Sequence, residues 1–194
     1  AAGRGFYSPD INASPELRAF VRNEVENLNP KVLPPDIPQQ DSTVAAYHLY
    51  LLYIVAAFWW LFGISWGSLE PLAAIMLGWY AAAAYGLFRL GMGRVVSLVC
   101  AVILMLSPPI LIMLPNLRDF SKAPFILTII FLLVYLIKVK PSLSRLAVYL
   151  PLLGLLIGVG MGFRQDIIIF IPTAILVACI SLYRVGNASL LRRS

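Results

Sequence analysis

Charged residues are scarce in this chain. Asp, Glu, Lys and Arg make up 12% of its 194 residues, whereas hydrophobic residues make up 60%. A soluble domain carries roughly twice that share of charge. A core built by so short a chain cannot absorb this much apolar surface, so lipid must be the solvent for much of it. The composition therefore excludes an ordinary soluble domain and predicts an all-α, polytopic transmembrane bundle.

Histidine and cysteine are also rare, with one histidine, His48, and two cysteines, Cys100 and Cys179, all within apolar runs. Two isolated cysteines of this kind predict neither a disulfide framework nor a zinc site. A lone histidine among tyrosines is more typical of hydrogen-bonded packing than of a ligand. The sequence also lacks HExxH, CxxC, P-loop and Gly-x-Ser-x-Gly patterns, so no local motif assigns a reaction.

The charges that are present divide the chain into two regions. Residues 1–42 hold four basic and six acidic residues, a net of −2, whereas residues 43–194 hold eleven basic and three acidic ones, a net of +8. Cationic loops between membrane spans usually face the cytoplasm. The basic residues form no clustered face of the kind that binds nucleic acid, so membrane lipids and not nucleic acid are the expected partners.

Residues 1–42 form the sizeable polar region, which we expect to be an external juxtamembrane segment. Ser14 followed by Pro15 is typical of an N-cap and a first helical position, and an amphipathic helix is predicted over 15–28. Its apolar face favours a position on the membrane surface or on the rim of the bundle. Four prolines between residues 29 and 40 predict a stiff, extended linker.

Residues 43–194 are predicted to be the transmembrane domain, with about five to six spans. The candidate spans are apolar runs near the roughly 20 residues needed to cross hydrocarbon: 43–64, 70–88, 95–115, 123–139, 146–162 and 167–183. Pro108 and Pro109 predict a kink in the third run. Gly154, Gly158 and Gly162 recur every four residues, which predicts close contact with another helix.

The loops give the expected sidedness. Cationic residues fall on alternate turns, which we place in the cytoplasm: Arg89 with Arg94, Lys138 with Lys140 and Arg145, and Arg184 with Arg192 and Arg193. The turns 116–122 and 163–166 then lie on the opposite side. If 43–64 and 70–88 both cross the membrane, residues 1–42 are cytoplasmic. If either is re-entrant or interfacial, as tryptophans near residues 59–66 suggest, they are external.

The two opposite-side turns carry the candidate site. Both mix cations with carboxylates, and we expect them at the same depth: Arg118, Asp119, Lys122, Arg164 and Asp166. Three interpretations stay open, namely solvated turns, a structural clamp of paired charges, and a cavity in which the three cations bind a phosphate or pyrophosphate. Charge so near hydrocarbon favours a functional role.

The order of several short segments resembles the GT-C superfamily of membrane glycosyltransferases, which includes protein mannosyltransferases and aminoarabinose transferases. The segments are Gly3-Arg4-Gly5-Phe6-Tyr7, Leu61-Phe62-Gly63, Tyr85 to Arg94, Leu106-Ser107-Pro108, Arg118 to Phe125, and Gly162-Phe163-Arg164-Gln165-Asp166 before Ile171-Pro172. The resemblance covers most of the chain, and the order of the segments carries it more than any single motif. Residues 122–124 depart from the Thr-Glu-Pro turn typical of the family.

The resemblance implies transfer of a sugar from a polyprenyl-phosphate carrier on the non-cytoplasmic side. It implies that Arg164 matches a frequent arginine position and that residues 118–122 match a second charged element. The family's catalytic carboxylate, a base or a ligand of a divalent metal, precedes the GRGF-like segment. It is therefore expected before Ala1, together with a first span, and no catalytic residue is carried over. The resemblance also places residues 1–42 outside.

The sequence-based prediction is thus a GT-C-like enzyme of the bacterial inner membrane, with a lipid-linked sugar as donor. The phosphate would contact Arg118, Lys122 and Arg164, while Asp119 and Asp166 orient those cations or contact sugar hydroxyls. The alternative is a non-catalytic accessory subunit that packs against other membrane subunits through its glycine stripe. A transporter is disfavoured, because the sequence contains no inverted repeat and no broken helix pair with a midplane charge.

Overall fold

The computed structural model describes residues 8–10, 14–33, 39–40 and 48–191. The GRGF-like segment, Arg192 and Arg193 lie outside the described residues, as do residues 43–47 of the first predicted span. The chain divides into two compact units, 1–75 and 76–194, each of which is described by itself. Within the described ranges the regular structure is helical, apart from an isolated bridge between Asn27 and Ser65 and a pair of two-residue antiparallel strands, β1 (Ser8–Pro9) and β2 (Gln39–Gln40).

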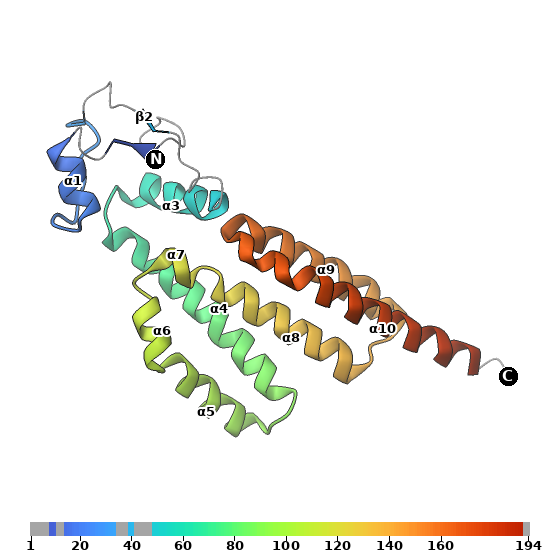
Figure 1. Ribbon diagram of the computed structural model, residues 1–194. Helices are drawn as coiled ribbons and strands as arrows, with labels where there is room; N and C mark the ends of the chain where they lie inside the picture. The colour runs from blue at the N-terminus through green and yellow to red at the C-terminus, as the bar shows by residue number, and fades with distance from the viewer. Residues whose placement is uncertain (1–7, 11–13, 34–38, 41–47, 192–194) are drawn as a thin grey trace. The chain divides into compact units, whose positions relative to one another are not determined.

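In chain order the helical elements are α1 (Pro15–Val21), α3 (Leu49–Phe62), the 3-10 turn η2 (Gly67–Leu69), α4 (Glu70–Arg89), α5 (Arg94–Met105), α6 (Pro108–Met113), α7 (Leu117–Phe120), α8 (Ala123–Val139), α9 (Leu143–Phe163), the 3-10 turn η3 (Gln165–Ile169) and α10 (Phe170–Leu191). From α3 onward the helical elements follow one another with short connections (Figure 1), whereas a long segment separates α1 from α3.

The start of α1 confirms the predicted cap. The Ser14 hydroxyl accepts from the Leu17 amide at 3.3 Å, and Pro15 occupies the first turn. Ser14 Oγ also donates to Glu16 Oε2 at 2.7 Å, and this hydrogen bond holds the pKa of the Glu16 carboxyl below its usual value. The predicted end at residue 28 is wrong: the helix ends at Val21, and Asn23 turns the chain with a left-handed φ of 60°.

An aromatic cluster closes the first unit. The Phe20 ring of α1 stacks on Trp66 with centroids 5.0 Å apart and meets the edge of Trp59 at 6.0 Å. Both indoles are also fixed through Nε1, which donates from Trp59 to the Ser65 carbonyl and from Trp66 to the Phe20 carbonyl. Helix α1 therefore packs through Phe20 against the end of α3 and the residues that follow it.

In the part of the chain that the structure describes, four helical stretches are long and apolar enough to cross a membrane: Gly67–Arg89, Leu117–Val139, Leu143–Phe163 and Gln165–Val185. They cover the predicted spans at 70–88, 123–139, 146–162 and 167–183, and fit a multi-pass membrane protein. The 14 residues of α3 extend over about 21 Å, less than the roughly 30 Å of a hydrocarbon core. The third predicted run breaks at residues 106–107 into α5 and α6, which confirms the kink before Pro108.

The core of the second unit is built around α8, which packs against α9 and α10. Phe125 meets Trp79 of α4 at 4.7 Å and Phe163 of α9 at 4.8 Å between ring centroids. The outward faces are also apolar: Val95 is 75% exposed and Leu155 is 63% exposed. A bundle in water would turn polar residues outward, so these faces indicate a lipid environment.

Two glycines of the predicted stripe, Gly154 and Gly158, make no close helix contact among the described residues. A Cβ at Gly154 or Gly158 would meet nothing within 4 Å, so these glycines face away from the bundle. Close packing occurs instead at Gly160, where a Cβ would lie 2.9 Å from Ile167 Cδ1 and 3.3 Å from Phe125 Cδ1. Gly160 lies two residues after Gly158 and therefore on a different face of α9. The four-residue spacing thus did not identify the glycine that packs against the neighbouring elements.

Candidate functional site

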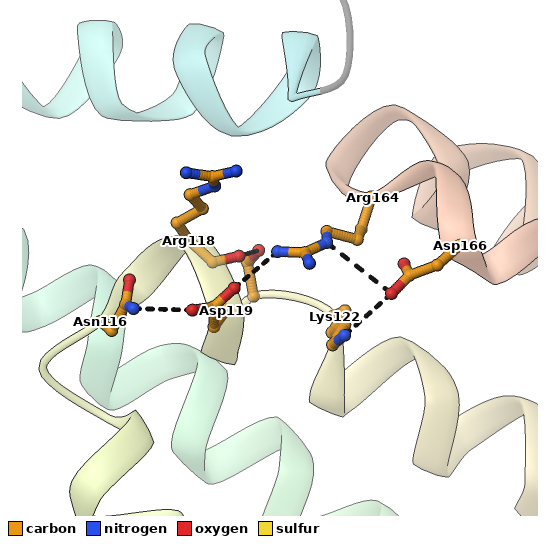
Figure 2. Close-up of polar contacts among 7 residues, drawn as sticks. Asn116, Arg118, Asp119, Lys122, Arg164 and Asp166 are labelled. Carbon is orange, nitrogen blue, oxygen red and sulfur yellow. Dashed lines mark hydrogen bonds and ion pairs between the residues drawn. The ribbon is translucent and has the colours of Figure 1, made fainter. Parts of the chain in front are cut away.

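The two charged turns predicted to lie at one depth come together at one end of the second unit (Figure 2). The residues 116–122, expected as a turn, contain the short helix α7, which leads directly into α8. On the other side, Arg164 is an extended residue (φ −157°, ψ 122°) between α9 and η3. Tight packing at Gly160 holds η3 against α8 and α9, and so brings the two turns within contact distance.

Two carboxylates and two cations alternate in an ion-pair chain. Arg164 Nη1 donates to Asp119 Oδ1 at 2.6 Å, and Lys122 Nζ donates to Asp166 Oδ2 at 2.8 Å. Arg164 Nε lies 3.7 Å from the same Asp166 oxygen, which joins the two pairs. We call Asp119, Lys122, Arg164 and Asp166 the mixed-charge cluster.

Asn116 extends the cluster and was not among the candidates chosen from the sequence. Its side-chain amide donates to Asp119 Oδ2 at 2.7 Å. Both oxygens of Asp119 are therefore engaged, one by Asn116 and the other by Arg164. The spacing Asn-x-x-Asp places the two side chains on one side of a helical turn, and this spacing could have indicated the contact in advance.

Arg118, the remaining candidate, lies beside the cluster. Figure 2 shows its guanidinium directed away from the other labelled side chains. Its backbone carbonyl accepts from the buried Ser121 hydroxyl at 3.1 Å, which fixes the end of α7. The structure thus brings four of the five predicted residues into direct contact and places the fifth next to them.

The cluster is partly open to solvent. Side-chain exposure is 25% for both cations, 38% for Asp119 and 47% for Asp166. Exposed ion pairs contribute little to stability, typically less than about 1 kcal/mol each. Within the cluster the two cations balance the two carboxylates. The exposure of Asp166 suits the exchange of this carboxylate for an anion from outside the chain.

The cluster does not fit the divalent metal that the family resemblance allows. Among the described residues, no three His, Cys, Asp or Glu side chains are placed to hold a metal ion. Asp119 and Asp166 are each bound to a cation, which competes with any metal for their oxygens. The chemistry available here is therefore recognition of an anion by ammonium and guanidinium groups.

Comparisons of the chain with protein-family models, with curated proteins and with solved structures found no match.

Proposed function

We propose that this chain is a GT-C-like membrane glycosyltransferase that transfers a sugar from a lipid-phosphate donor at the mixed-charge cluster. The observation that carries the proposal is the convergence of Lys122 and Arg164 from two separate turns at one end of an apolar helical unit. Charged groups bordering hydrocarbon favour a functional role, and paired arginine and lysine suit a phosphate. The order of sequence segments that resembles the superfamily supports the same reaction.

In this proposal the donor phosphate replaces Asp166 at the two cations. Asp166 is the most exposed member of the cluster, and its contact with Arg164 Nε is long, at 3.7 Å. Asp119 stays in place, because Asn116 and Arg164 hold its two oxygens, and it keeps the guanidinium oriented. Displaced Asp166 is then available to a sugar hydroxyl.

The cations act on the leaving group. An acceptor hydroxyl attacks the anomeric carbon of the donor sugar, and the bond from that carbon to the carrier phosphate breaks. The phosphate leaves with the bonding electrons, and Lys122 and Arg164 stabilise the negative charge that develops on it. The acceptor proton passes to a base that we do not assign among the described residues.

The proposed topology places the cluster on the non-cytoplasmic side of a bacterial inner membrane, in a bundle of five to six spans. The four long apolar stretches support the multi-pass part of this assignment. Since α3 is short and apolar, we assign it to the interface and residues 1–42 to the outside.

Substitution of the arginines tests the proposal in the full-length natural protein. Arg164→Ala should reduce sugar transfer from a polyprenyl-phosphate donor by at least about tenfold, the loss of one charge-stabilising group. Arg118→Ala should have a smaller effect, because its guanidinium is directed away from the cluster. Lys138→Ala, which removes a cation far from the cluster, should leave the rate unchanged. A wild-type rate in Arg164→Ala would overturn the proposal.

A second candidate is a non-catalytic accessory subunit of a larger membrane complex. The outward-facing Gly154 and Gly158 favour it, since a neighbouring helix could approach the backbone of α9 closely there. In this case the mixed-charge cluster is a clamp between two turns. Gly154→Leu with Gly158→Leu should then release a co-purifying membrane subunit in mild detergent, and Arg164→Ala should not alter transfer.

A further inference from the structure

The opposite end of the second unit carries cations alone. Three segments lie toward this end: the α4–α5 turn, the α8–α9 turn and the later part of α10 (Figure 1). We call this group the basic end, and its six members are Arg89, Arg94, Lys138, Lys140, Arg145 and Arg184. All six are exposed in the structure.

No described carboxylate compensates these charges. Within residues 76–191 the acidic residues are Asp119 and Asp166, and both belong to the mixed-charge cluster at the other end. The ion pairs formed by described residues likewise all lie in that cluster. Like charges at one end of the unit repel one another, and a partner rich in negative charge would relieve this repulsion.

The backbone of the helix ends holds two of the six cations in place. Arg89 Nη1 donates to the Met92 carbonyl at 2.9 Å, and Arg184 Nη1 donates to the Ile137 carbonyl at 3.3 Å. The second bond ties α10 to the end of α8, where the last carbonyls of a helix need donors. These side chains therefore stay at the end of the bundle and do not extend freely into solvent.

The depth of the basic end indicates the kind of partner. The stretch Leu117–Val139 has 23 residues and so extends over about 34 Å, close to the thickness of a hydrocarbon core plus part of its interface. Because the mixed-charge cluster lies at its start, the cations at its other end reach the opposite headgroup layer. Tyr135 and Tyr149, with ring centroids 5.1 Å apart, lie near the same end, as is typical of interfacial aromatics.

Exposed apolar side chains adjoin the cations. Ile137 is 44% exposed beside Lys138, and Tyr183 is 71% exposed beside Arg184. Soluble polyanions such as nucleic acids contact cations on a polar surface, whereas a phospholipid presents a phosphate directly above its acyl chains. Cation and apolar surface side by side match the second arrangement.

We propose that the basic end binds the phosphate groups of anionic phospholipids, independently of the glycosyl transfer proposed above. Lys138, Lys140 and Arg145 supply cations from the α8–α9 connection and its flanks, and the guanidiniums of Arg89 and Arg184 are held by backbone carbonyls.

The test uses the whole chain in bilayers of equal parts phosphatidylcholine and phosphatidylglycerol, followed by gentle extraction and quantitative mass spectrometry of the retained lipids. The wild-type chain should retain phosphatidylglycerol in excess. The neutral variant Lys138→Gln, Lys140→Gln, Arg145→Gln should lose at least about threefold of that enrichment. The matched variant Lys138→Arg, Lys140→Arg, Arg145→Lys keeps the charge and should keep the enrichment.

A second charge removal, Arg22→Gln with Lys31→Gln in the first unit, should also leave the enrichment unchanged. Unaltered enrichment in the neutral variant, or an equal loss in both charge-removing variants, would overturn the proposal. The wild-type chain alone gives a further check: raising NaCl from about 0.1 M to 1 M shortens the screening length from about 10 Å to about 3 Å and should abolish the enrichment. Salt-independent retention, or displacement of the lipid by an oligonucleotide, would contradict it.

Discussion

The two ends of the second unit differ in how their charged side chains are neutralised and held in place. At the mixed-charge end, cations and carboxylates from distant turns bind one another, and their positions depend on side-chain pairing. At the basic end, the unit contributes no described carboxylate, and two of the cations, Arg89 and Arg184, are held by backbone carbonyls. At the mixed-charge end, a ligand can replace one of the carboxylates that already pair with the cations. At the basic end, an anion from outside the chain would have to supply the negative charge.

The largest expected effect is on the free energy of unfolding, when the packing beneath the mixed-charge end is disrupted. Leucine at Gly160 would place its Cβ 2.9 Å from Ile167 and 3.3 Å from Phe125, and overpacking of this kind costs about 2 kcal/mol. Gly160→Leu should therefore lower the free energy of unfolding, measured by denaturant titration in detergent. Gly158→Leu is the matched control on the same helix and should change it by less than about 0.5 kcal/mol, because nothing lies within 4 Å. Equal effects of both would show that η3 does not pack on α9 as described.

A smaller effect measures the pairing itself. A double-mutant cycle with Asp119→Asn and Arg164→Gln should give a coupling free energy of about 0.5–1 kcal/mol, since both side chains remain partly exposed. Asp119→Asn combined with Lys140→Gln, which lies at the other end, should give none. A cycle without coupling between Asp119 and Arg164 would mean that the two turns are not clamped to each other.

The smallest expected effect concerns the basic end, where backbone conformation and charge can be separated. Lys140 has a left-handed φ of 49°, a conformation that glycine adopts without steric cost. Lys140→Gly should raise the free energy of unfolding by up to about 1 kcal/mol. Lys140→Gln removes the charge, keeps the strained backbone and should give no such gain. A gain in both variants would assign the effect to charge repulsion instead.

Much of this organisation could be predicted from local sequence rules. Ser14 before Pro15 predicted the start of α1, and Pro108 predicted the break between α5 and α6. The alternation of charge types along the chain predicted which turns share an end, because successive antiparallel helices return the chain to the same side. These features depend on residues that are close in sequence or on helices that alternate in direction. Both can be inferred from a single sequence.

Features that depend on tertiary packing could not be predicted. The spacing of Gly154 and Gly158 resembles a contact surface, yet Gly160 makes the contact, because the position of Phe125 on another helix decides it. The sequence also could not indicate that Arg164 pairs most closely with Asp119 and not with Asp166, because both carboxylates lie on the two turns that meet there. Whether a helix face meets protein or lipid is set by neighbouring helices, and apolar residues are suited to both.

The most direct test is to measure which side of the membrane each end of the second unit faces. In a Cys100→Ala, Cys179→Ala background, single cysteines replace the exposed Gln165 at the mixed-charge end, Ser144 at the basic end and Lys31 in the first unit. Intact cells or oriented vesicles are then treated with a membrane-impermeant thiol reagent. We expect Gln165→Cys and Lys31→Cys to label from outside, and Ser144→Cys to label only after the membrane is opened. Labelling of Gln165→Cys and Ser144→Cys from the same side would contradict the account, because the two ends would then not face opposite sides of a membrane.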